Sequence, residues 1–298
     1  MEYNRQQRQT KNFFEKFSRQ WSRNAKTRSN SGVNVIKQRN DYVLKIASHF
    51  LSKGRKALDV GCGTGDLTIQ LLEKGFDAYG IDFASSMIKR AISEAYRKKF
   101  SQDRFEVRSF FEYSIDEKFD LISANGFIEY ISEKQLDQFI QMCNKFLKHN
   151  GLLVFSSRNR LFNVFSFNNY SLAEIKIKHL TYLIEECILF NKIKTFNELL
   201  RTKYVPRISR NLQTHDDTGF HIDTRYQYTP CQVINKLKKH GFKTIDIVPI
   251  HIHVFTTGAR SRLPKIHDFV SNSVQDKPVA NLQLLPQSSS FMITARKA

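Results

Sequence analysis

The stretch Leu58-Asp59-Val60-Gly61-Cys62-Gly63-Thr64-Gly65-Asp66-Leu67-Thr68 decides the fold. A short apolar segment leads into three glycines at alternate positions, and a helical pattern follows. Glycine lets the backbone approach a ligand closely and adopt conformations that a Cβ forbids. The stretch therefore predicts a strand, a ligand-binding loop and a helix in direct succession.

Strand and helix patterns alternate on both sides of this loop, which predicts repeated β-α units around a parallel sheet. Strands are expected at residues 56–60, 77–82, 105–108, 119–124, 152–155, 244–255 and 291–295. Helices are expected at residues 33–52, 67–75, 85–100 and 133–148, and again after Thr229-Pro230. Asn150-Gly151 is interpreted as a helix stop, and a turn-rich segment is expected before the final strand.

Asp82 stands at the end of the second predicted strand, about 20 residues after the loop, where an acidic group meets ribose hydroxyls. Dinucleotide sites use a Gly-x-Gly-x-x-Gly spacing, and Asp66 occupies the position of its third glycine. The loop and Asp82 together predict an adenosine-containing cofactor. The missing phosphate-type spacing favours S-adenosylmethionine.

Residues 33–158 and 229–298 resemble the class I S-adenosylmethionine-dependent methyltransferase family. The similar segments are Asp59 to Gly65, Gly80 to Met87, and Phe119 to Ile122 leading to Asn125 to Tyr130. The resemblance implies an α/β fold: a Rossmann-like, doubly wound, mostly parallel seven-stranded sheet with an antiparallel last strand. A helical cap insertion is expected on it.

The same resemblance implies how the cofactor lies. The glycine loop would face its methionine part, Asp82 its ribose, and Phe83 and Met87 its adenine, although core packing is the alternative for the last two. Ser109 and Phe110 stand where many members place an aspartate near the adenine amine. Asn125 would lie near the transferred methyl group or serve as a turn residue. The expected cofactor residues are Asp59, Gly61, Cys62, Gly63, Gly65, Asp82, Phe83, Met87, Ser109, Phe110 and Asn125.

Three regions are expected along the chain. Residues 1–32 form a basic amphipathic helix or lid, because Phe13, Phe14, Phe17 and Trp21 recur on one helical face. Packing on the domain, a mobile lid and a membrane-surface helix all explain this stripe. Residues 33–159 and 229–298 form the methyltransferase core, and residues 160–228 form a helical acceptor-binding insertion with one long helical stretch.

Polar and aromatic groups gather where the insertion returns to the sheet, between His221 and Pro230. This segment resembles the acceptor region of a small-molecule subgroup that includes the ubiquinone-biosynthesis O-methyltransferases, although the long insertion departs from it. The expected substrate contacts are Phe17, Trp21, Tyr130, Arg158, Asn159, His215, Asp223, Tyr226 and Tyr228.

An oxygen or nitrogen acceptor loses a proton during methyl transfer, and histidine suits that role near neutral pH. His221 is the first candidate base, with His251, His215 and Glu129 in reserve. His251 and His253 alternate along a strand and so face one side, as a metal pair would. The sequence shows no third ligand, and no metal is expected.

Charge and cysteine content limit the partners and the compartment. The 298 residues carry a formal charge of +19, which favours anionic partners or reflects solvated surface charge. Cys62, Cys143, Cys187 and Cys231 form no CxxC pair, and no apolar run approaches the ~20 residues of a membrane span. A cytoplasmic protein is expected, with peripheral membrane contact left open, and the sequence does not indicate an oligomeric state.

Methylation of a small or amphipathic molecule by in-line displacement is the leading functional hypothesis. An RNA or protein methyltransferase that uses the basic surface is the alternative. Asn125-Gly126-Phe127-Ile128 stands where amino-methylating nucleic-acid enzymes carry a Pro-Pro-Tyr type motif, which counts against the alternative. A third reading is a cofactor-binding scaffold without methyl transfer.

Overall fold

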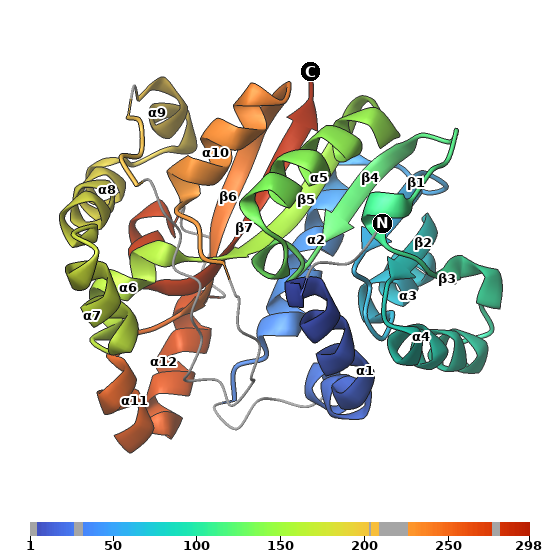
Figure 1. Cartoon of the computed structure of the whole chain (residues 1–298), viewed down its shortest axis with the longest axis horizontal. Helices are drawn as coiled ribbons and strands as arrows, with labels where there is room; N and C mark the ends of the chain where they lie inside the picture. Colours follow the sequence, from blue (N-terminus) through green and yellow to red (C-terminus); the bar gives the residue numbers. More distant parts are fainter. Residues whose placement is uncertain (1–4, 27–31, 203, 209–225, 276–280) are drawn as a thin grey trace.

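The computed structural model describes residues 5–26, 32–202, 204–208, 226–275 and 281–298. Its centre is a seven-stranded sheet with the order β3-β2-β1-β4-β5-β7-β6 (Figure 1). The strands are β1 (Lys56–Val60), β2 (Asp77–Asp82), β3 (Phe105–Val107), β4 (Phe119–Ala124), β5 (Leu147–Arg158), β6 (Phe242–Ile252) and β7 (Ser288–Lys297). β7 pairs antiparallel with both β5 and β6, whereas the ladders from β3 to β5 are parallel. The expected Rossmann-like sheet is confirmed.

The sheet grows outward from β1 in two directions. β1 pairs with β2 on one side and with β4 on the other. The strand order therefore reverses between β3 and β4, because β4 is added on the opposite side of β1. Open α/β sheets bind ligands at the carboxyl ends of the strands beside such a switch point. The topology therefore places a site at the ends of β1, β2 and β4.

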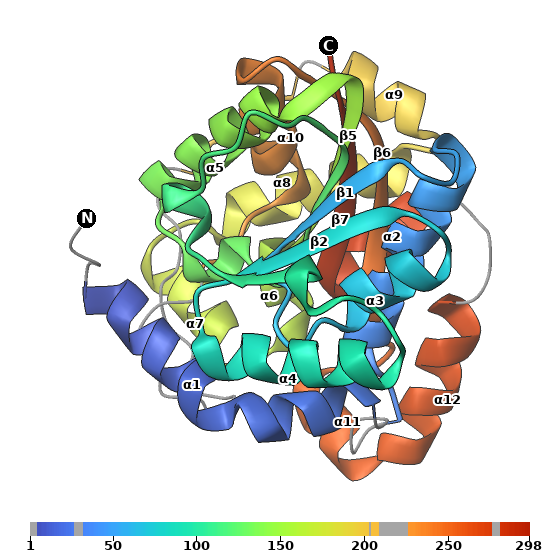
Figure 2. The ribbon, with the colours of Figure 1, turned by 90° about the vertical axis from the view of Figure 1, so that its right-hand side faces the viewer.

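Helices cover both faces of the sheet. The longer helices are α1 (Arg5–Lys26), α2 (Val35–Phe50), α4 (Ser85–Arg97), α5 (Glu133–Phe146), α8 (Leu180–Lys192), α10 (Pro230–Lys239) and α12 (Pro264–Gln275). Shorter ones are α3 (Asp66–Glu73), α6 (Asn163–Ser166), α7 (Asn169–Lys176), α9 (Phe196–Arg201) and α11 (Thr257–Arg262). Figure 2 shows α2 and α3 on one side of the strands and α5 and α10 on the other.

Strand residues alternate between two buried clusters. Leu121 and Val154 pack with α2 and α3, whereas their neighbours Ile122 and Phe155 pack with α5, α8 and α10. Successive side chains of a strand point to opposite faces, so continuous apolar strands supply both cores. Burial on both faces is typical of parallel strands covered by helices on each side.

The N-terminal helix α1 runs beside α4 at the edge of the domain, and both views agree (Figures 1 and 2). The Glu15 carboxylate accepts hydrogen bonds from the backbone N–H groups of Ser85 and Ser86 at 2.7 and 2.8 Å. These groups belong to the first turn of α4, where no intrahelical acceptor exists. A side chain of α1 thus caps α4 from outside.

The insertion differs from the expected single long helix. It contains α6, α7, α8 and α9, and the break between α7 and α8 falls at Lys178, whose φ is +59°. A left-handed residue cannot continue a right-handed helix. The Arg160 guanidinium, fully buried after β5, donates to both carboxylate oxygens of Glu174 in α7 at 2.8 Å. The boundaries 160–228 stay a prediction.

Two further expectations were wrong. The helix predicted over residues 133–148 ends at Phe146, because Leu147 already pairs with Phe119 of β4, and Asn150-Gly151 lies inside β5. The segment expected to be turn-rich contains α11, α12 and the 3-10 helix η5 (Asn281–Gln287). No apolar helical period marks α12, since its buried side chains are His267 and Ser271. Within the described ranges, no helix is both long and apolar enough to cross a membrane.

Candidate cofactor and acceptor site

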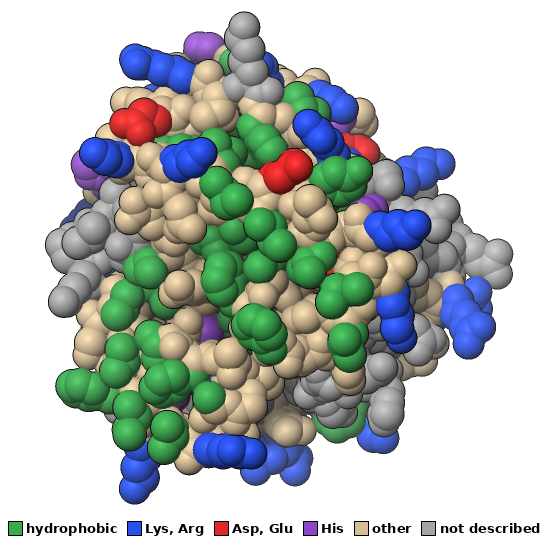
Figure 3. Space-filling view, turned by 90° about the vertical axis from the view of Figure 1, so that its left-hand side faces the viewer, with side chains coloured by type: hydrophobic (Ala, Val, Ile, Leu, Met, Phe, Trp, Pro, Cys, Tyr) green, Lys and Arg blue, Asp and Glu red, His purple; other side chains and the backbone are tan. Residues whose placement is uncertain are grey.

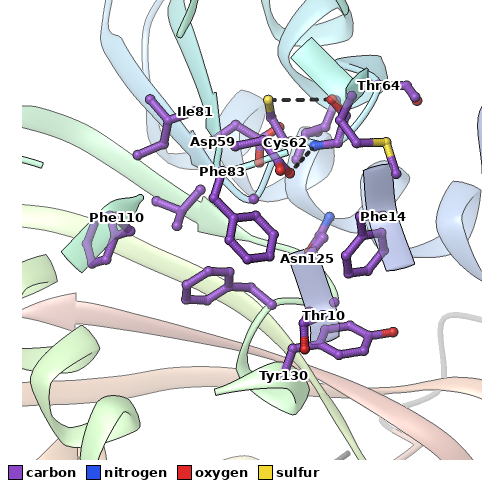
Figure 4. Close-up of a pocket in the computed structure, with 18 of the residues that line it drawn as sticks. Thr10, Phe14, Asp59, Cys62, Thr64, Ile81, Phe83, Phe110, Asn125 and Tyr130 are labelled. Atoms are coloured by element: carbon purple, nitrogen blue, oxygen red, sulfur yellow. Dashed lines mark hydrogen bonds between the residues drawn. The ribbon is translucent and has the colours of Figure 1, made fainter. Parts of the chain in front are cut away.

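A pocket opens at the carboxyl ends of β1, β2 and β4, where the topology places a site. Its empty volume is about 1160 Å³, measured out to its open mouth. Figure 4 shows Asp59 and Ile81 on the side of the strand ends, and Thr10 and Tyr130 on the opposite side. The predicted residues that line it are Trp21, Asp59, Gly61, Cys62, Gly63, Asp82, Phe83, Met87, Ser109, Phe110, Asn125 and Tyr130.

The glycine loop needs its glycines for two separate reasons. Gly61, Gly63 and Gly65 all have positive φ, of +67°, +54° and +80°. A Cβ on Gly65 would also lie 2.8 Å from the Cβ of Ala91 in α4. Gly65 caps α3 and does not line the pocket, so its role is to bring α3 and α4 together behind the loop.

Asp82 joins the loop to the end of β2. Its carboxylate accepts hydrogen bonds from the backbone N–H groups of Gly63 at 3.0 Å and Ala84 at 2.9 Å. Burial raises the pKa of Asp82 to about 6, against the lowering effect of those two bonds. A buried carboxylate with a raised pKa beside an open pocket is a typical ligand-binding group.

Asp59 lies one layer deeper. Its two carboxylate oxygens accept from the hydroxyls of Thr68 in α3 and Ser123 in β4, both at 2.9 Å. Burial raises the pKa of Asp59 to about 7. These bonds make it the group that holds the loop, α3 and β4 together. The neighbouring Cys62 thiol stays protonated, because burial raises its pKa well above the usual value.

Aromatic side chains form much of the remaining wall. Phe127 follows β4, and its ring centroid lies 6.4 Å from that of Phe110 and 6.3 Å from that of Phe111. Phe83 follows β2 and faces the same space (Figure 4). Rings at these separations pack edge to face or tilted, which gives a rigid apolar surface. Such a surface suits a flat ring system.

Helix α1 closes the pocket from outside. Phe14 lines it and packs edge to face on Tyr130, with ring centroids 5.3 Å apart. The Trp21 indole nitrogen lies 3.9 Å from the position of a Cβ on Gly63. The Gln6 side chain donates to the Tyr130 carbonyl at 3.0 Å. Phe17, an expected substrate contact, packs on Phe13 and does not line the pocket.

Asn125 occupies the tip of β4, as predicted. Its side-chain nitrogen donates to Asn40 Oδ1 of α2 at 3.1 Å. Within the described part of the chain, its buried Oδ1 accepts no hydrogen bond. An orphaned buried acceptor at a pocket wall fits a ligand that brings a donor.

The candidate bases are separated by the structure. Glu129 lies behind the pocket wall, and its carboxylate is held 3.9 Å from Arg39 and 3.8 Å from Arg158. His251 lies away from the pocket, and burial lowers its pKa well below the usual value. His221, His215 and Asp223 fall outside the described residues.

The structure gives three expected substrate contacts other roles. The Asn159 amide is buried and donates to the carbonyls of Leu285 and Ser288 at 2.5 and 3.0 Å, which joins β5 to η5. Tyr226 and Tyr228 stack at 6.3 Å inside the core. None of the three lines the pocket, and neither does Arg158.

Several lining residues were missed by the sequence reasoning. They are Gln7, Thr10, Phe14, Ile36, Arg39, Asn40, Val60, Thr64, Asp66, Leu67, Ile81, Arg108, Phe111, Gly126, Phe127 and Ile131. Phe14 belongs to the aromatic stripe that predicted a helix, so its signal was present. Arg39 and Asn40 lie on α2, outside any motif, and only the packing of α2 beside β4 reveals them.

A methyltransferase-domain family model matches residues 51–203, just over half of the chain. The chain belongs to the methyltransferase-domain family. This confirms the class I S-adenosylmethionine-dependent methyltransferase resemblance. The matched region includes β1 to β5 and the loops that form most of the pocket.

Curated relatives share part of this methyltransferase's length. A ubiquinone biosynthesis O-methyltransferase of Pasteurella multocida is 32% identical over 117 residues, covering 36% of this chain and 48% of its own. One of Bradyrhizobium diazoefficiens is 29% identical over 167 residues, covering 56% and 61%. The chain spans about half the length of the curated relatives it matches.

Solved structures show the same fold at low identity. Magnesium protoporphyrin IX methyltransferase of Synechocystis, with bound S-adenosylhomocysteine, gives a TM-score of 0.50 at 12% identity, covering 89% of this chain and 85% of its own. An S-adenosylmethionine-dependent methyltransferase of Clostridium acetobutylicum gives 0.51 at 13%, covering 88% and 92%. These likenesses support the fold.

Proposed function

We propose that this chain transfers a methyl group from S-adenosylmethionine to an oxygen or nitrogen of a small or amphipathic acceptor by in-line displacement. The observation that carries the proposal is the Asp82 carboxylate at the end of β2, beside a glycine loop and an open pocket. Family membership supports the same reaction class.

The residues present fit the cofactor. When bound, S-adenosylmethionine supplies the methyl group from its sulfonium. Asp82 would accept hydrogen bonds from the ribose hydroxyls, and Phe83 would hold the adenine, with Ser109 and Phe110 at its edge. The orphaned Asn125 Oδ1 would accept from the amino group of the methionine part. Gly61 and Gly63 leave the space that this part requires.

The acceptor would enter between α1 and the aromatic wall. Phe14, Trp21, Tyr130, Phe111 and Phe127 line this side, and such a lining recognises an apolar or aromatic body. Because α1 covers the pocket, this arrangement favours a small acceptor over a nucleic acid or protein chain. RNA or protein methylation stays the alternative, and it predicts binding that weakens steeply with salt.

The proton of the acceptor needs a base. Glu129 keeps its carboxylate beside two guanidinium groups, Arg39 and Arg158, and Arg39 reaches the pocket. We assign Glu129 a positioning role toward Arg39. His221 stays the predicted base.

Apolar side chains on the cap extend this proposal to membrane contact. Leu172, Ile175, Ile184 and Ile188 of α7 and α8 are exposed, and Figure 3 shows hydrophobic side chains gathered on this face with Lys and Arg around them. Exposed apolar residues rimmed by cations suit an anionic lipid surface that carries an amphipathic acceptor. Co-sedimentation with phosphatidylglycerol vesicles, and not with phosphatidylcholine vesicles, would support this contact.

Calorimetric titration with S-adenosylhomocysteine tests the cofactor assignment. Asp82→Ala should weaken binding at least tenfold, whereas Asp116→Ala, an exposed carboxylate outside the pocket, should leave it unchanged. A radiolabelled methyl-transfer screen against fractionated cell extract then identifies the acceptor. Equal affinity of Asp82→Ala and the wild-type protein would refute the placement.

A further inference from the structure

Three buried histidines meet at the end of β6, outside the cofactor pocket. His251 belongs to β6, His253 follows it, and His267 comes from the first turn of α12. One ring nitrogen from each can be chosen so that all three lie within 4.8 Å of one another. Their exposed fractions are 8%, 8% and 0%.

Most of their ring nitrogens have no protein partner. In the described part of the chain, His251 Nε2 and both ring nitrogens of His253 and His267 make no hydrogen bond. A buried polar group left unpaired costs about 1–3 kcal/mol. Five such atoms in one cluster point to a ligand that satisfies several of them at once.

The second ring nitrogen of His251, Nδ1, already has a hydrogen-bond partner in the protein. His251 Nδ1 lies 3.2 Å from Ser289 Oγ, at the start of β7. Metal-ligating histidines commonly use their second nitrogen in this way, which sets the tautomer and turns the first nitrogen toward the ion. Here the bond leaves Nε2 as the free ligand atom.

The backbone around the cluster is held in an unusual conformation. His251 has a φ of +55°, which a residue with a side chain adopts at a cost of about 1–3 kcal/mol. Its N–H donates to Gln38 Oε1 of α2 at 3.0 Å. Strain of this kind persists where the surroundings impose it, often at ligand sites.

Polar contacts hold helix α12 against β6, and they fix the position of His267, the third histidine. Ser271, one turn after His267, donates to the Ile252 carbonyl, and Gln275 donates to the Pro249 carbonyl at 2.9 Å. The exposed side chains of α12 include Ile266 and Phe269, so its apolar residues do not drive the docking. The helix buries a histidine and a serine against β6.

We propose that His251, His253 and His267 bind a divalent transition-metal ion, with Zn²⁺ the ion that fits best. Zn²⁺ takes imidazole nitrogens at about 2.0–2.1 Å in tetrahedral geometry, which places ligand atoms about 3.4 Å apart. In the metal-free structure the three ligand atoms lie within 4.8 Å of one another, so they must draw closer to bind the ion. Three protein ligands leave a fourth position for water or another small ligand.

The charges around the cluster are mixed. Arg260, Arg158 and Arg39 act on the histidines from three elements, and Asp268 next to His267 carries the opposite charge. Burial, followed by neighbouring positive groups, lowers the pKa of His253 to about 3. The neutral imidazole is the form that binds a metal. The cationic neighbours favour hydroxide or another anion in the fourth position.

The site is separate from the cofactor pocket, and none of the three histidines lines that pocket. An ion there would join the end of β6 to α12. Arg39, which lines the pocket, also donates to Ser290 at 2.9 Å, one residue beyond Ser289. Arg39 therefore links the pocket wall to the β7 segment that also carries Ser289, the partner of His251.

Metal binding by the full chain tests the proposal. After treatment with a chelator and dialysis, titration with Zn²⁺ alone should show one tight site, and Co²⁺ should give the visible absorption of a tetrahedral complex. His267→Gln and His253→Gln should each lose this site, and His49→Ala, at an exposed histidine of α2, should keep it. Ser289→Ala should weaken Zn²⁺ binding by about 10-fold, the low end of the range for outer-shell partners.

Circular dichroism and S-adenosylhomocysteine binding show whether each variant is folded. A folded His267→Gln protein that binds Zn²⁺ as the wild type does would overturn the proposal, as would a wild-type protein without a tight site. Because the cofactor readout is independent, loss of the metal site and failure of the proposed function are distinguishable.

Discussion

If Asp82 binds the cofactor ribose as proposed, cofactor affinity should depend on pH. Burial raises the pKa of Asp82 to about 6 in the ligand-free protein, so about half of the molecules carry a protonated Asp82 at that pH. In the proposed binding mode the ribose hydroxyls would donate to the ionised carboxylate, so affinity should weaken progressively as the pH falls through about 6. If only the ionised form binds, the Kd for S-adenosylhomocysteine rises about tenfold between pH 7 and pH 5, or ~1.4 kcal/mol.

Isothermal titration calorimetry at pH 5, 6 and 7 measures how the Kd changes with pH, and the Asp82→Asn variant is the control. The variant should bind weakly with little pH dependence. Asp59, with a pKa of about 7, titrates nearby, but its oxygens are committed to Thr68 and Ser123. A wild-type Kd that is constant over this range, or an Asp82→Asn protein with the full slope, would refute the reasoning.

Three further changes test the architecture. Gly65→Ala should lower the free energy of unfolding by about 1–3 kcal/mol because of its left-handed backbone, and further because the new Cβ would contact α4. Urea denaturation should show a smaller loss for the control Gly54→Ala, because Gly54 also has a positive φ, of +78°, but has open space around it. Glu15→Ala removes the cap on α4, a loss of about 1 kcal/mol, and limited trypsin digestion should cut α1 faster than in the wild type. Arg160→Met leaves Glu174 buried without its cation, so unfolding free energy should fall by about 3–5 kcal/mol; a stability equal to the wild type would contradict this.

The sheet and the cofactor loop could be predicted because their signals are local. The bounds of β1, β2 and β4 match the expected ranges, since each is a short, mainly buried segment whose ends are marked by polar residues or glycine. The positive φ of Gly61, Gly63 and Gly65 is what the spacing of the glycines requires. Residues 56–82 thus carry both fold and site in one short segment.

Contacts between distant segments could not be predicted in the same way. His267 lies 14 positions beyond His253, in a segment whose buried face is polar and so gives no apolar helical period. Sequence pattern identified His251 and His253 as a pair. Only the docking of α12 on β6 supplies the third ring, through Ser271 and Gln275.

The aromatic stripe of α1 shows why alternatives drawn from sequence need not exclude one another. Packing on the domain and covering the site were treated as separate interpretations. Phe13 packs with Tyr130, while Phe14 of the same face lines the pocket. Because Tyr130 itself lines the pocket, packing against it places α1 over the cofactor site. Any opening of α1 must then break the Glu15 cap and the Phe14 contact together, which couples access to the site with the stability of α4.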